Sequence, residues 1–151
     1  MSYVIRLLAA AAGTIFFSLS MRIPRRAIPV TALLASVGYT VYLILSNIAG
    51  AEVLGYFLAS ALIALGSEIA ATLMKMPAMI FMFPGVIPLV PGISIYRTLL
   101  LLVQKEYIGF MELGTKTLFA LGAMAVGIAL VNEVARRVHM AKKKKLSATR
   151  S

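Results

Sequence analysis

The chain has 151 residues, of which 61% are hydrophobic and only 13% are charged, and it carries a formal net charge of +10. So few polar side chains cannot cover a small soluble domain, which excludes the soluble globular class and indicates an integral membrane protein. The chain contains no cysteine, so disulfides and thiolate metal sites are excluded, and nothing in the sequence calls for a cofactor. We therefore expect an all-α integral membrane protein.

Five apolar windows are long enough to cross the hydrocarbon of a bilayer, which takes about 20 helical residues. They predict five transmembrane helices, at residues 3–21, 28–45, 53–73, 78–103 and 110–131. These spans make up a single transmembrane domain over residues 1–135. Residues 136–151 then form a basic cytoplasmic tail.

The first span has a competing interpretation, because Arg6 followed by an apolar run and a small residue at Ser20 resembles a signal peptide. Cleavage there would export three arginines, Arg22, Arg25 and Arg26, behind a segment with one basic residue. The charge balance therefore favours a retained span.

The basic residues set the orientation, since short cytoplasmic loops carry an excess of lysine and arginine. With five crossings, the clusters that follow the first, third and fifth spans fall on one side: Arg22, Arg25, Arg26, Lys75, Arg136, Arg137 and lysines 142–145. The N-terminus is then outside and the C-terminus is cytoplasmic. We expect the tail to meet anionic lipids and to bind no nucleic acid, because no aromatic residue follows Met140 to stack on bases.

The third span contains a carboxylate, Glu68, near its cytoplasmic end. Such a group can change protonation with its surroundings, which suits ion coupling. The alternative is an interfacial residue that pairs with Lys75 or with a partner chain. His139 is expected to be a solvated residue of the tail and not a metal ligand.

The fourth span is interrupted by prolines and glycines at Pro84, Gly85, Pro88, Pro91 and Gly92. Proline removes a backbone donor, so a helix broken in hydrocarbon persists only where protein or a water-lined cavity receives the freed polar groups. Such breaks typically mark ligand or ion pathways. A discontinuous crossing helix is favoured over a re-entrant loop, because it keeps the basic tail cytoplasmic.

The two halves of this span have predicted ends. Pro77 is expected in the first turn of a half-helix that ends near Pro84 or Pro88, and Ser94 is expected to cap a second half-helix over residues 95–104. Together with Tyr96 and Arg97, the free amides of that cap would make a corner that binds a carboxylate. The alternative is that Arg97 snorkels or pairs permanently with Glu68.

Small residues recur at four-residue spacing, a pattern that permits close helix contact in lipid. The pairs are Ala9 with Gly13, Gly55 with Ala59, Gly66 with Ala70, and Ala123 with Gly127. The sequence supplies no nucleophile with its base, no phosphate-binding loop and no metal-ligand cluster, so an enzyme is the least supported class.

Two segments resemble the small proteins of the threonine/serine exporter family. They are residues 22–27 (RIPRRA), which lead into a span with Gly38 and Tyr39, and residues 86–96 (VIPLVPGISIY), with Pro77 one half-helix before them. The resemblance extends from the first span into the fifth. The basic tail after Arg136 is not part of the family pattern.

The resemblance implies a small subunit that is equivalent to the C-terminal membrane half of longer family members. It implies a larger membrane subunit as partner, a location in the bacterial inner membrane, and secondary export of threonine and serine or, in a two-subunit relative, succinate. Self-association into a homo-oligomer stays open.

Two other functions compete with this exporter hypothesis. The chain could be a structural or assembly subunit that packs against the true transporter without touching its substrate. It could also be an ion channel with a path lined by carbonyls of the unwound segment.

Overall fold

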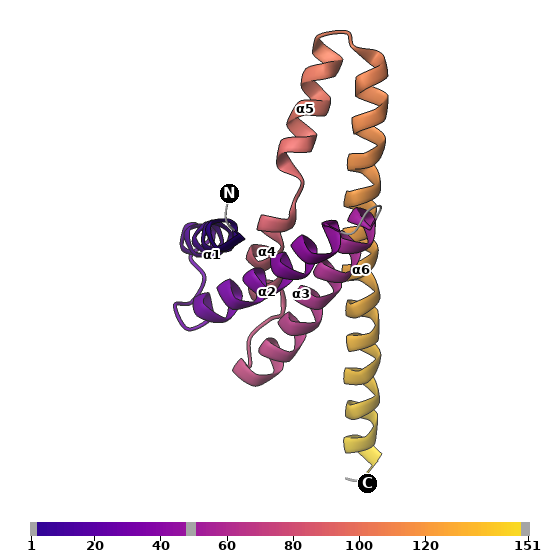
Figure 1. The fold of residues 1–151 in the computed structure, drawn as a ribbon. Coiled ribbons are helices and arrows are strands. Elements are labelled where there is room, and N and C mark those ends of the chain that lie inside the picture. The colour runs from indigo at the N-terminus through magenta and orange to yellow at the C-terminus, as the bar shows by residue number, and fades with distance from the viewer. Residues whose placement is uncertain (1–2, 48–50, 149–151) are drawn as a thin grey trace.

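The structure, a computed structural model, describes residues 3–47 and 51–148, and these fold into helices joined by short turns (Figure 1). No strand occurs within those two ranges, so the predicted all-α class is confirmed. The elements are α1 (Tyr3–Ser20), α2 (Ile28–Ser46), α3 (Glu52–Met74), α4 (Met79–Val86), the 3-10 helix η1 (Ile87–Leu89), α5 (Gly92–Val103) and α6 (Tyr107–Ala148).

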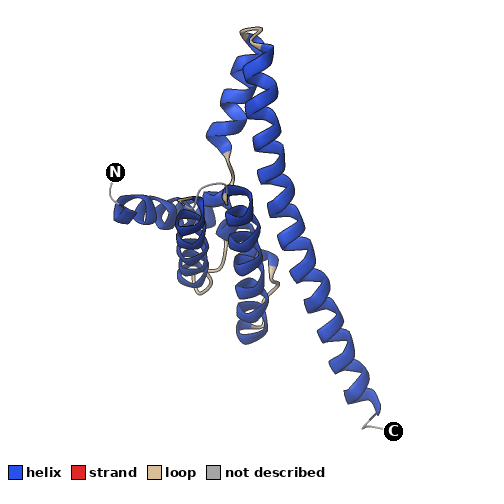
Figure 2. Cartoon of the chain, turned by 45° about the vertical axis from the view of Figure 1, so that its right-hand side comes forward, coloured by secondary structure: helices blue, strands red, loops and turns tan. Residues whose placement is uncertain are grey.

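Three helices are long and apolar enough to cross a membrane: α2, α3 and the Tyr107–Ala141 part of α6. A fourth candidate span is the pair formed by Met79–Leu89 and α5, which bend by 55° at their break. The predicted count of five spans is therefore not confirmed. The helix in question is α1, whose apolar part, Val4–Ser20, is shorter than any of the three spanning helices. Figures 1 and 2 show α1 lying across the direction of α3 and α6.

The core of the molecule is the contact between α3 and α6, which run in the same direction. The hydroxyl of Ser60 donates a hydrogen bond of 3.2 Å to the carbonyl of Met124 across this contact. A Cβ added at Gly127 would lie 2.6 Å from Ser60 Oγ and 2.7 Å from the carbonyl oxygen of Phe57. Only glycine allows the two backbones to approach so closely, and the predicted packing role of Gly127 is confirmed.

The other small residues differ in their surroundings. A side chain at Gly66 would collide with Leu34, and one at Gly55 would lie 3.3 Å from Leu45 Cβ, so both glycines lie where α3 meets α2. A Cβ at Gly13 would meet nothing within 4 Å. The prediction of a close helix contact at Gly13 is therefore wrong, since α1 turns this residue toward open space.

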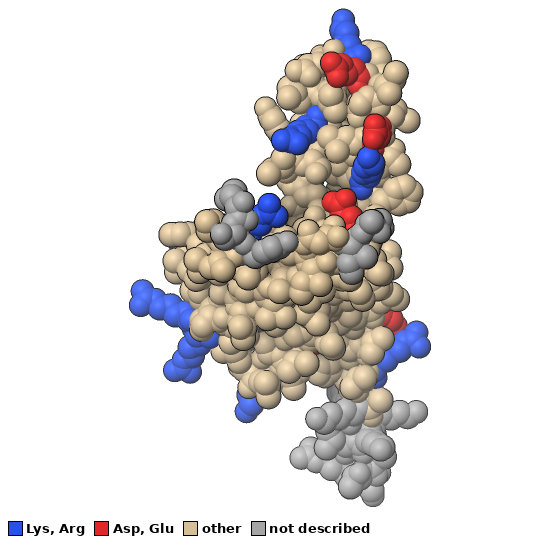
Figure 3. Space-filling model, in the orientation of Figure 1, with Lys and Arg blue, Asp and Glu red and all other residues tan. Residues whose placement is uncertain are grey.

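An uncharged band divides the surface into two charged ends (Figure 3). In α3 the uncharged stretch covers residues 53–67, and in the parallel α6 it covers residues 117–132. Glu52 and Lys116 flank the band at one end, where both line the same cavity. This band matches the part of the molecule that hydrocarbon can accept.

The last helix is longer than the sequence predicts. α6 continues past residue 131 to Ala148, because no proline or glycine interrupts residues 132–148 and Glu133 pairs with Arg136 and Arg137 one turn later. Its 42 residues extend for about 63 Å, roughly twice the thickness of the hydrocarbon. Both ends of α6 therefore reach beyond the uncharged band. Residues 149–151 of the predicted tail lie outside the described residues.

At its other end, α6 forms a hairpin with α5 that projects past α1–α4 (Figures 1 and 2). Residues 92–116 make up this hairpin, which we call the α5–α6 hairpin. Its two helices pack against each other through Thr98, whose methyl carbon would lie 3.2 Å from a Cβ at Gly114.

Candidate functional site

The helix break lies between η1 and α5. Pro84 lies inside α4 and Pro88 inside η1, Val90 is extended, and α5 begins immediately after Pro91. The first half-helix begins at Met79, two residues after Pro77, and it extends through η1 to Leu89. Pro84, Gly85 and Pro91 are buried, whereas Gly92 is exposed.

The predicted cap at Ser94 is wrong. Pro91 occupies the N-cap position of α5, its carbonyl accepts the N–H of Ile95 at 3.0 Å, and no side chain caps the helix. Ser94 therefore lies in the first turn of α5, and its carbonyl accepts a 2.8 Å hydrogen bond from the hydroxyl of Thr98.

A cavity of about 170 Å³ opens beside this break, between α3, α5 and α6. Pro91 and Ser94 contribute its wall from the break. Opposite charges meet in the same wall, since Glu52 begins α3 and Lys116 lies on α6. Hydroxyl groups come from Ser94, Tyr56 and Thr117, and the other lining residues are Val53, Leu113, Phe119 and Ala120.

Lys116, which lines this cavity, forms an ion pair with an acidic side chain of the same helix. Lys116 Nζ donates to Glu112 Oε1 at 2.8 Å, one turn earlier in α6, and both side chains are about two-thirds exposed. Glu52 is also exposed, and among the described side chains no hydrogen bond or ion pair joins it to Lys116. Lys116 therefore keeps donors available for a ligand, because an ammonium group has three.

Tyr96 and Arg97 are exposed on α5, further from the break than the sequence predicts. Because α5 starts at Gly92, Arg97 belongs to the second turn, beyond the free amides of the first. Ser94 and Arg97 are three residues apart, so they share a face of the helix. Arg97 is therefore a cation one turn beyond the cavity.

A second cavity, of about 290 Å³, lies on the other side of the break. Pro88 and Ile87 of η1 line it together with Tyr39 of α2 and Arg6 of α1. Its wall on α1 is completed by small residues, among them Gly13, and by Ile5. The break therefore has a cavity on each of two sides.

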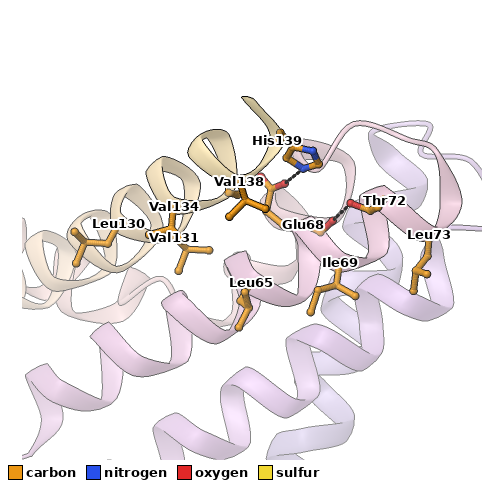
Figure 4. A pocket seen from close by; sticks show the side chains of 11 residues that line it. Leu65, Glu68, Ile69, Thr72, Leu73, Leu130, Val131, Val134, Val138 and His139 are labelled. Carbon is orange, nitrogen blue, oxygen red and sulfur yellow. Dashed lines mark hydrogen bonds and ion pairs between the residues drawn. The ribbon is translucent and has the colours of Figure 1, made fainter. Parts of the chain in front are cut away.

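Glu68 lies on α3, close to the C-terminal part of α6. Its side chain is 23% exposed, and its Oε2 is 3.9 Å from Nε2 of His139 (Figure 4). That distance is too long for a hydrogen bond, so the contact is electrostatic when the imidazole is protonated. The alternative of a permanent pair between Glu68 and Arg97 finds no support among the ion pairs of the described side chains.

Glu68 and His139 stand at one end of an open apolar groove between α3 and α6, with a volume of about 540 Å³. Leu65, Ile69, Val131 and Val138 are among its lining residues (Figure 4). A smaller hollow of about 430 Å³ shares Glu68 and His139 and includes Lys75. Glu68 thus lies where an apolar wall meets basic side chains at the end of the band.

Sequence reasoning missed three residues, namely Glu52, Lys116 and His139. The signal for His139 was available, because a helix continued past residue 131 puts positions 131, 135, 138 and 139 on one face. The pairing of Glu52 with Lys116 in one cavity had no local signal, since it depends on the parallel packing of α3 and α6. Among the residues searched in the structure, no group of three or more histidine and acidic side chains could hold a metal ion.

Comparisons with known proteins agree with this architecture. The family described as "Threonine/Serine exporter, ThrE" matches residues 6–134, which covers most of the chain. An uncharacterized protein of Haemophilus influenzae is 29% identical over 133 residues, which cover 82% of this chain and 44% of that relative. The chain thus spans less than half the length of this relative. No solved structure matches.

The family match includes most of α1, all of α2 to α5, and α6 as far as residue 134. It therefore includes the uncharged band and the helix break. The chain is a multi-pass membrane protein that belongs to the threonine/serine exporter family.

Proposed function

We propose that this protein is one subunit of a secondary transporter that exports small carboxylates or hydroxy amino acids across the bacterial inner membrane. The candidates are threonine and serine or, as in a relative of the two-subunit type, succinate. The observation that carries the proposal is the 55° break between η1 and α5, beside a cavity with charged and hydroxyl side chains. Broken membrane helices of this kind form substrate sites in secondary transporters.

In this proposal the break supplies the substrate pathway. Pro84, Gly85, Pro88, Pro91 and Gly92 keep α4 and α5 from joining into one rigid helix. Ser94, Tyr96 and Arg97 then follow along α5, and Arg97 receives the carboxylate of the substrate. The N-terminus is outside and the C-terminus is cytoplasmic, in line with the basic end of the molecule.

We assign ion coupling to Glu68, and this gives a first testable prediction. Glu68→Gln cannot take up or release a proton, so we expect efflux driven by an imposed pH gradient to fall by at least about tenfold. Exchange of substrate without a gradient should persist. The measurement is efflux from proteoliposomes that contain this chain and its partner.

The control for this prediction is Glu133→Gln, the same substitution at an acidic residue of α6 that pairs with Arg136 and Arg137. Gradient-driven efflux should be near the wild-type level in the control. Equal losses in both variants would contradict a specific coupling role for Glu68.

We further propose that the partner is a larger membrane subunit and that it covers the α5–α6 hairpin. Apolar side chains of this hairpin project outward, with Ile108 89%, Val103 79% and Ile93 73% exposed. The hairpin lies beyond the uncharged band and also contains ionic groups such as Lys105 and Glu106. Water would not accept its apolar side chains and hydrocarbon would not accept its charges, so a protein partner suits both.

The relative of this chain is much longer than the region that the two proteins share, and this bears on the kind of partner. The matched region accounts for 44% of the Haemophilus influenzae protein, so more than half of that chain lies outside it. The larger subunit that we propose as partner would contain a counterpart of that additional part. Binding of a second copy of this chain to the hairpin is the competing outcome of the test below.

Ile108→Asp is expected to prevent assembly with the larger subunit, because it puts a carboxylate at the most exposed apolar position of the hairpin. Copurification of a tagged partner from detergent should fall by at least about tenfold. Ile108→Leu keeps the apolar surface and should leave the yield unchanged. Normal yield with Ile108→Asp, or loss only of a homodimer of this chain, would contradict the assigned partner.

A further inference from the structure

The cavity between α3, α5 and α6 carries the strongest additional information, because its wall combines one acidic and one basic side chain. Glu52 and Lys116 come from helices that are distant in sequence, and the parallel packing of α3 and α6 brings them to the same 170 Å³ cavity. A space of that size holds about six water molecules, so it can accept a ligand as small as an amino acid.

We infer that Glu52 and Lys116 form a charge-paired site that selects zwitterionic α-amino acids over dicarboxylates. The inference rests on the proposed export function and deepens it. The carboxylate of Glu52 accepts the α-ammonium group of the ligand, and Lys116 donates to the α-carboxylate that Arg97 also binds. The hydroxyls of Ser94 and Thr117 are then the available partners for a hydroxyl on the ligand side chain.

Charge explains why this cavity discriminates between the two substrate classes. A dicarboxylate such as succinate would bring a second negative charge to the wall that contains Glu52, and like charges at close range repel. Glu112 adds to this repulsion, since it lies one turn from Lys116 and contacts its ammonium group at 2.8 Å. Lys116 can retain Glu112 and still bind a carboxylate, because it has three donors.

The hydroxyl groups of the wall are consistent with the same ligand class. Thr117 Oγ1 already donates to the carbonyl of Leu113 at 2.7 Å, so it is left to accept a hydrogen bond. A ligand hydroxyl can donate to it. This supports a hydroxy amino acid over an amino acid with a purely apolar side chain.

The test uses the purified complex of this chain with its partner, in two assays. Thermal unfolding in detergent reports binding, because a ligand that binds the folded state raises the midpoint temperature. Efflux from proteoliposomes loaded with labelled L-threonine or labelled succinate reports transport. The variants are Glu52→Gln, Glu52→Asp and Lys116→Met, with Glu133→Gln as a control at a carboxylate outside the cavity wall and outside the α5–α6 hairpin.

For the wild-type complex we expect stabilisation and efflux with L-threonine, and at least tenfold less efflux with succinate. Glu52→Gln should raise the KM for threonine at least tenfold and reduce the preference over succinate. Glu52→Asp keeps the carboxylate and should retain part of the preference for threonine over succinate. Lys116→Met should weaken binding of both ligands, and Glu133→Gln should behave as wild type.

Three results would overturn this inference, and they differ in what they say about export. Equal threonine KM values in Glu52→Gln and Glu133→Gln, with active wild-type protein, would reject the site and leave the proposed export function intact. A wild-type preference for succinate would reject the zwitterion and keep carboxylate export. Transport of neither ligand by a folded wild-type complex would reject the export function together with the site.

Discussion

Gly127→Ala is expected to destabilise the protein by about 1–3 kcal/mol, the usual cost of overpacking a tight contact. The added methyl group would lie 2.7 Å from the carbonyl oxygen of Phe57, which belongs to the backbone of α3 and cannot rotate away. The helices must therefore separate, and the hydrogen bond from Ser60 to Met124 lengthens with them. Thermal unfolding of the purified protein in detergent measures the effect as a lower midpoint temperature.

Gly122→Ala is the matched control, since it lies on the same helix and a Cβ there would meet nothing within 4 Å. It should be neutral or slightly stabilising, because alanine is the better helix former. Equal midpoints for Gly122→Ala and Gly127→Ala would show that α3 and α6 do not approach each other at Gly127 as described.

Arg97→Ala should abolish export while the protein still inserts and assembles. In the proposed mechanism its guanidinium grips the two oxygens of the substrate carboxylate, and alanine removes both donors. We expect efflux to fall at least about tenfold, with an unchanged amount of complex in the membrane. Arg97→Lys keeps the positive charge but lacks the planar guanidinium group that binds two oxygens at once, so it should recover only part of the activity.

Arg22→Asn provides the control for Arg97, because it removes a positive charge from the turn between α1 and α2. Arg22 has a φ of 54°, a conformation that asparagine tolerates better than other side chains. Its efflux should match that of the wild type. Wild-type efflux by an inserted Arg97→Ala variant would rule out the assignment of Arg97 to substrate.

The positions of the helices could be predicted because they follow from composition and flanking charge. Arg26 and Lys75 precede α2 and α4 closely, and the predicted starts at residues 28, 53 and 78 each lie within one residue of the observed starts. The end of α6 could not be predicted in this way. Past residue 131 the helix is stabilised by ion pairs within it and by contact with α3. A prediction from the length of an apolar segment takes neither into account.

The candidate site was predicted only where it depends on the local chain. The prolines and glycines of residues 84–92 identified the break, since their effect on a helix is local. The sequence predicted Ser94 as the N-cap because serine has a side chain that can cap a helix. In the structure Pro91 is the N-cap of α5, and only its backbone carbonyl accepts a hydrogen bond there. Glu52 and Lys116 lie 64 residues apart in the sequence, so only the packing of α3 with α6 could reveal that they share a cavity.

The competing functions differ from the proposed exporter in how mutations would act. A structural subunit without substrate contacts predicts that substitutions at Arg97 and Glu68 change the yield of the complex and leave transport per complex unchanged. An ion channel predicts a flux that rises with substrate concentration without saturating.

The central claim is that this chain forms, with its larger partner, an exporter with the substrate at the break between η1 and α5. The most direct test is efflux of labelled threonine, serine and succinate from proteoliposomes that contain the wild-type complex, with and without a pH gradient. The account predicts saturable efflux that the gradient accelerates and that Arg97→Ala removes. Non-saturating flux, or the same efflux from complexes with and without Arg97, would contradict it.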